Sequence, residues 1–86
     1  MASIQDVVNA AYRIGESANG VQKRTLQSAD ALKRHANQLR AVAQGSRSGM
    51  EAAQQVDQAE REVRQSAAQL LSLQSSINRF IQDASK

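Results

Sequence analysis

The chain has no cysteine, no proline and no tryptophan, and its only aromatic residues are Tyr12 and Phe80. Without cysteine it can form neither a disulfide nor a thiolate metal site. The longest apolar runs are two or three residues, far below the ~20 that a membrane-spanning helix needs. The amino-terminal segment has no basic region followed by an apolar one. We therefore expect a cytoplasmic protein, or one secreted without a cleaved signal peptide.

Residues that commonly perform catalysis or hold metals are also scarce. His35 is the only histidine, and the acidic residues do not form an inward-facing pair. We expect no enzymatic activity, no cofactor and no bound metal, and we interpret His35 as a polar residue of the seam that sets register or forms a hydrogen bond across the interface. The net charge is +3 without a basic cluster longer than two residues, which does not favour nucleic-acid binding.

The first half of the chain has the heptad pattern of one long amphipathic helix. With position a at Ile4, every charged residue between residues 4 and 43 falls at b, c, f or g. The a positions are Ile4, Ala11, Ala18, Thr25, Leu32 and Leu39, and the d positions are Val7, Ile14, Val21, Ser28, His35 and Val42. Gly15 and Asn19-Gly20 are weak points, but the pattern stays in phase across them, which favours a continuous or mildly kinked helix over a break.

The second half repeats this pattern. The a positions are Val56, Val63, Leu70, Ile77 and Ala84, and the d positions are Ala52, Ala59, Ser66, Leu73 and Phe80. Acid-before-base pairs four residues apart support the helices locally. These pairs are Asp30 with Arg34, Asp57 with Arg61, and Glu60 with Arg64.

Start and stop signals divide the single domain, residues 1–86, into helix 3–44, turn 45–48 and helix 49–84. Ser3 and Asp6 form a helix start, and Gly45 suits a left-handed residue just past a helix end. Ser48 and Glu51 have capping-box spacing, with Gly49 between them. Two long helices with so short a link must fold back antiparallel. The fold is therefore predicted to be an all-α hairpin, with Tyr12 and Phe80 at its open end.

The apolar stripe is wider than one helix–helix seam needs. Two helices alone cannot bury it, and a chain this short gains little from its own core. We predict that a second hairpin covers this face in a four-helix bundle, as a homodimer or a heterodimer. The expected partner-binding residues are Ile4, Val7, Val8, Ile14, Val21, Leu32, Leu39, Val56, Val63, Leu70, Leu73, Ile77, Phe80 and Ile81.

The layout resembles the Trp-x-Gly (ESAT-like) small proteins linked to type VII secretion. The matching bend segment is Arg47-Ser48-Gly49-Met50-Glu51-Ala52-Ala53, with Arg47 in place of the tryptophan. Phe80 and Asp83 are similar to the family's tail signal, with the acid three residues after the aromatic instead of four. The resemblance implies a hairpin that pairs with itself, a related hairpin or a toxin's helical domain for targeting or export.

Two other interaction classes stay open. Needle subunits of type III secretion are hairpins of similar length, although the absence of proline from the bend counts against a needle. A small helical chaperone of that system, or an unrelated cytosolic helical adaptor, also fits the pattern.

Overall fold

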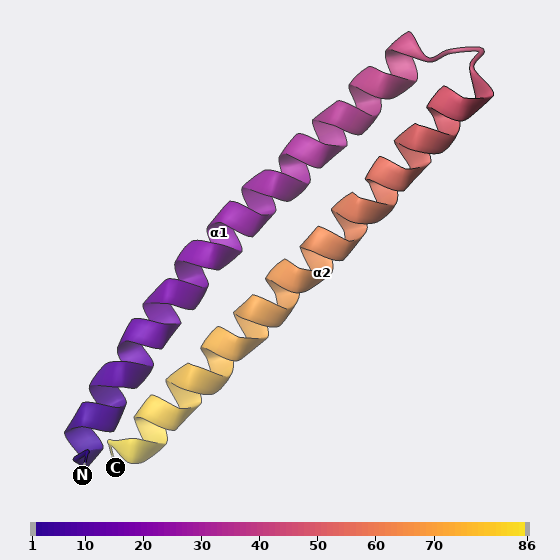
Figure 1. The fold of residues 1–86 in the computed structure, drawn as a ribbon. Helices are drawn as coiled ribbons and strands as arrows, with labels where there is room; N and C mark the ends of the chain where they lie inside the picture. The colour runs from indigo at the N-terminus through magenta and orange to yellow at the C-terminus, as the bar shows by residue number, and fades with distance from the viewer. Residues whose placement is uncertain (1, 86) are drawn as a thin grey trace.

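The computed structural model describes residues 2–85 and contains two α-helices packed antiparallel along their whole length. Helix α1 spans Ile4–Val42 and helix α2 spans Arg47–Ala84. The molecule is a rod measuring 63 × 18 × 14 Å, with both chain ends at one end and the bend at the other (Figure 1). Residues 2–85 include no β-strand. The predicted all-α hairpin is confirmed.

Helix α1 begins where its capping residues predict and continues without a break. The Ser3 side chain accepts a hydrogen bond from the Asp6 N–H at 3.1 Å, and the Asp6 carboxylate accepts one from the Ser3 N–H at 3.2 Å. The helix runs through Gly15 and Gly20. A β-carbon at Gly15 would lie 3.5 Å from Ile77 of α2, so the helices approach closely there.

The bend is placed two residues earlier than predicted. The Ser46 N–H donates to the Ala43 carbonyl at 2.9 Å, and Gly45 has a φ of 82°. A positive φ at the third residue of a four-residue turn favours glycine. The helices are therefore joined by residues 43–46, not by 45–48.

The predicted cap of the second helix is also wrong. Ser46 is extended, and its side chain accepts a hydrogen bond from the Gly49 N–H at 3.2 Å, while Ser48 lies inside the first turn of α2. The turn at Gly45 is completed early, so the extended residue that precedes α2 is Ser46. Gly49 stands where a capping box needs a long polar side chain. Glu51 instead forms an ion pair with Arg47 at 3.4 Å.

The two helices touch along their a and e positions. The buried residues are mostly alanines, which let the backbones approach closely. They are Val8, Ala11, Ala18, Ala29 and Ala36 on α1 and Ala53, Ala67 and Ile81 on α2. Heptad analysis placed the seam on a and d, whereas the larger d side chains lie beside it, because the small e residues permit the closer contact.

Polar contacts fix the register of the two helices. Arg40 on α1 donates to both carboxylate oxygens of Asp57 on α2, at 2.6 and 3.2 Å. Arg64 on α2 bonds Asp30 on α1 at 3.0 Å and also pairs with Glu60 in its own helix. The predicted Glu60–Arg64 pair is confirmed. Asp30 and Asp57, expected to pair within their own helices, pair across the hairpin instead.

Candidate protein-interaction surface

The larger apolar side chains of the d positions are exposed on one side of the hairpin. Because the helices touch through a and e, the d positions of both helices flank the contact on the same side. We call this side the apolar face and define it by the d residues of both helices. Of its bulky members, Val42 near the bend is 83% exposed, and the others are between 38% and 56% exposed. They are Val7, Ile14 and Val21 on α1 and Leu73 and Phe80 on α2.

The apolar face is hollowed near the open end of the rod. A groove of about 380 Å³ is lined by Val7 and Ile14 from α1 and by Phe80 from α2. The same groove touches Ala11 and Ile77 of the seam. Side chains from both helices thus form one continuous apolar depression, which is the shape that accepts side chains from another helix.

Towards the bend, the apolar face becomes partly polar, and its α2 side chains become smaller. Here it carries His35 and Val42 on α1 and Ala52 and Ala59 on α2. His35 is exposed on this face and is not held in the hairpin seam. Its predicted role as a polar interface residue therefore depends on a partner. Ser28 and Ser66, both exposed, lie between the bulky and the small halves.

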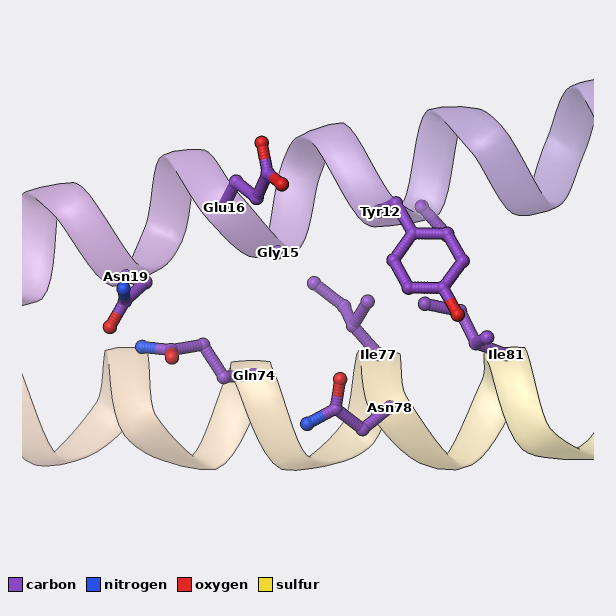
Figure 2. A pocket seen from close by; sticks show the side chains of 9 residues that line it. Tyr12, Gly15, Glu16, Asn19, Gln74, Ile77, Asn78 and Ile81 are labelled. Atoms are coloured by element: carbon purple, nitrogen blue, oxygen red, sulfur yellow. The ribbon is translucent and has the colours of Figure 1, made fainter.

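The opposite side of the hairpin carries most of the polar contacts, although Leu26, Met50 and Leu71 are exposed there at b positions. A hollow of about 350 Å³ near the open end is lined by Tyr12, Asn19 and Gln74 among others (Figure 2). Gln74 donates to Gln22 across the hairpin at 3.0 Å. Tyr12 and Phe80 therefore both lie near the open end, as the sequence predicts, but they line grooves on opposite faces.

The electrostatics of the hairpin are concentrated away from the apolar face. The hydrogen bond from Arg40 lowers the pKa of Asp57 below its ordinary value, and the same bond raises the pKa of Arg40. Hydrogen bonds to Glu60 and Asp30 likewise raise the pKa of Arg64. The ion pairs between α1 and α2 fix the register of the two helices. None of these charged residues is at a d position.

The residues predicted to bind a partner occupy three environments. Val8 and Ile81 are buried in the hairpin, and Ile4 is highly exposed at its end. Half-buried at the a positions of the seam are Leu32, Leu39, Val56, Val63, Leu70 and Ile77. The exposed members of the apolar face are Val7, Ile14, Val21, Leu73 and Phe80.

Two residues of the groove were not selected from the sequence. Ala10 and Ser76 line it beside Val7 and Phe80. Both occupy g positions, which adjoin the d row on a helix surface, and their small size was the available signal. Of the predicted tail signal, Phe80 lines the groove, whereas Asp83 is exposed near the end of α2.

Residues 2–85 form neither a metal-binding cluster nor a membrane-spanning helix. Among residues 2–85, no group of three or more His, Cys, Asp or Glu side chains is placed to hold a metal ion. In the same range, neither helix is apolar enough along its length to cross a membrane.

Comparison with known proteins adds no relative. No protein-family model, curated protein or solved structure matches this chain significantly.

Proposed function

We propose that this chain is a non-enzymatic protein–protein interaction module that pairs with another helical protein through the apolar face, giving a four-helix bundle. The observation that carries this proposal is the distribution of apolar side chains. The buried seam consists mainly of alanines, whereas Ile14, Leu73 and Phe80 are about half exposed.

The energetics of the hairpin support a partner. Complete burial of a large apolar side chain stabilises a fold by about 1.5–3 kcal/mol, and alanine offers much less area. No large side chain of residues 2–85 is fully buried. Ordering each residue costs about 1.5 kcal/mol, so a lone hairpin of this composition has little net stability. A second helical pair on the apolar face would bury the d-position side chains that the first pair leaves in water.

We further propose that the pairing serves targeting or export in type VII secretion. The support lies in the bend. Gly49, the glycine that matches the family motif, lies in the first turn of α2 directly against Ala43 of the turn. Ala52 and Ala53 follow it on the same helix. Arg47, in the place of the tryptophan, is exposed and paired with Glu51. At this position the side chain therefore forms a surface ion pair instead of an aromatic contact.

Light scattering of matched variants tests the interaction proposal. Leu73→Glu places a charge on the apolar face, whereas Leu71→Glu places the same charge at an exposed b position on the other side. We expect the wild type and Leu71→Glu to associate, alone or with the product of the neighbouring gene, and Leu73→Glu to remain at the 9.3 kDa of one chain. If the wild type is a stably folded monomer at micromolar concentration and binds no helical partner, the proposal is wrong.

The secretion role needs a separate test. In cells that carry a type VII system, we expect deletion of that system's ATPase to abolish export of this chain or of its bound partner. Export that continues without the ATPase would contradict the secretion role. Filaments of the purified chain in electron micrographs would favour a needle subunit.

A further inference from the structure

The d residues of α2 change in size from one end of the helix to the other. From bend to open end they are Ala52, Ala59, Ser66, Leu73 and Phe80. Ser66 lies midway in this row. Ala59 and Leu73 are equally distant from Ser66, and so are Ala52 and Phe80. Reversing the row about Ser66 therefore places each bulky residue opposite an alanine.

Five of the six d residues of α1, from Ile14 to Val42, are centred at the same height, and Val7 lies beyond them. Ser28 lies midway between Val21 and His35, and midway between Ile14 and Val42. Asp30, two residues after Ser28, bonds Arg64, two residues before Ser66, at 3.0 Å. Because the helices are antiparallel, this contact places Ser28 and Ser66 at one level of the rod. A single two-fold axis across the rod can then relate both rows to their own copies.

Resting on the proposed function, we propose that the apolar face is covered by a second copy of this chain, with its bend over the first copy's open end. The axis passes between the Ser66 side chains of the two copies and between their Ser28 side chains. Phe80 and Leu73 of each copy then face Ala52 and Ala59 of the other. The interface is self-complementary, as two-fold dimers require.

Side-chain volume favours this orientation over the alternative with both bends at one end. In the alternative, α1 of one copy lies over α2 of the other, and residues at the same level meet. Phe80 and Leu73 would then face Ile14 and Val21, so the largest side chains of both copies would meet at one end, while Ala52 and Ala59 would face Val42 and His35 at the other. Well-packed interfaces place large residues against small ones, and overfilling one end while leaving voids at the other is destabilising.

Charge at the edge of the interface is compatible with the same orientation. Both d rows lack charged residues, so no charge is buried. Glu51 and Arg79 lie on the outer flank of α2, 15 residues before and 13 residues after Ser66 (66 − 51 and 79 − 66). The two-fold axis brings Glu51 of one copy to nearly the level of Arg79 of the other. An exposed pair of this kind adds little affinity, but opposite charges favour the register.

Cysteine cross-linking tests the inference directly, because the chain has no cysteine of its own. Ser66→Cys and Ser28→Cys each place one thiol at the axis. Ser75→Cys, at an exposed position outside the apolar face, is the matched control. Circular dichroism would check that each variant keeps its helices. Under mild oxidation, we expect Ser66→Cys and Ser28→Cys each to give a covalent dimer of twice 9.3 kDa, and Ser75→Cys to give none.

The other outcomes separate this inference from the proposed function. Cross-links that form only when Ser28→Cys and Ser66→Cys chains are mixed would place both bends at one end and overturn the arrangement. No cross-link, together with the mass of one chain in light scattering, would overturn the second copy as the occupant. If such a monomer still bound the neighbouring gene's product and lost it on Leu73→Glu, the inference would fall while the proposed function stood.

Discussion

Gly49 in the first turn of α2 lies so near Ala43 that a β-carbon on residue 49 would overlap the Ala43 β-carbon. The turn therefore depends on the missing side chain at residue 49. We predict that Gly49→Ala opens the bend and lowers the free energy of unfolding by roughly 1–3 kcal/mol, the usual cost of an overpacked contact. Urea denaturation followed by circular dichroism at 222 nm measures this loss.

Gly20→Ala is the matched control for Gly49→Ala. Gly20 lies inside α1, and its added β-carbon would meet only the flexible end of Arg24, at 3.5 Å. Alanine is the better helix former, so this variant should gain about 0.5–1 kcal/mol. Equal stability changes in the two variants would show that helix propensity, and not the contact with Ala43, governs residue 49.

The Arg40–Asp57 contact predicts an acid-sensitive contribution to stability. The hydrogen bond from Arg40 lowers the pKa of Asp57 below its ordinary value in the folded protein. A lowered folded pKa stabilises the fold above the ordinary value and loses that stabilisation as the pH falls through the folded pKa. We expect the wild type to lose stability below about pH 4, and Asp57→Asn to lose less.

Thermal unfolding between pH 7 and 2 checks this difference, with Glu16→Gln as a control for the loss of an exposed carboxylate. At neutral pH, Asp57→Asn should be the less stable protein. Parallel pH profiles for the wild type and Asp57→Asn would show that the pair contributes no pH-dependent stability.

Local signals in the sequence were sufficient for the helices but not for their contact. Ser3 and Asp6 cap α1 as predicted, and Gly45 adopts the predicted left-handed conformation. Ser48 was preferred as the cap of α2 because capping-box spacing is a local pattern. The use of Ser46 depends on where the turn ends, which Gly45 and the approach of Gly49 to Ala43 decide together.

The choice of seam could not be read from periodicity. Because the apolar stripe covers positions a, d and e, the helices could pack through a and d or through a and e. Ala29, Ala36 and Ala53 at e are buried because small side chains let the backbones come close, and this comparison needs both helices at once. The same holds for the ion pairs. Asp57 has Arg61 one turn away in its own helix, yet only the three-dimensional register shows that Arg40 reaches it.

Substitution of His35 should affect association of the chain but not the stability of the single hairpin. Its side chain is exposed on the apolar face, so removing it should change the stability of the hairpin by less than about 0.5 kcal/mol. A partner would have to remove the imidazole from water. We therefore expect His35→Leu to strengthen association by several-fold in sedimentation equilibrium. Lys33→Leu, at an exposed b position outside the face, is the control and should leave the association constant unchanged.

Exchanging two side chains tests whether size complementarity, and not only apolar area, sets the self-association of the chain. Phe80→Ala removes the bulky member of a pair, and Ala52→Phe would place two aromatic rings against each other across the two-fold axis. Each single variant should weaken self-association by about tenfold or more, since cavities and overpacked contacts each cost more than 1 kcal/mol. In the double variant Ala52→Phe/Phe80→Ala, every phenylalanine again faces an alanine, so association should return to near the wild-type value.

If Ala52→Phe alone strengthens association, the face binds by apolar area without the reversed register. If the loss of association free energy in the double variant equals the sum of the losses in the two single variants, residues 52 and 80 do not meet across the interface. Sedimentation equilibrium on the four proteins decides between these results, because only the reversed pairing of the α2 rows predicts weakening by both single changes and recovery by their combination.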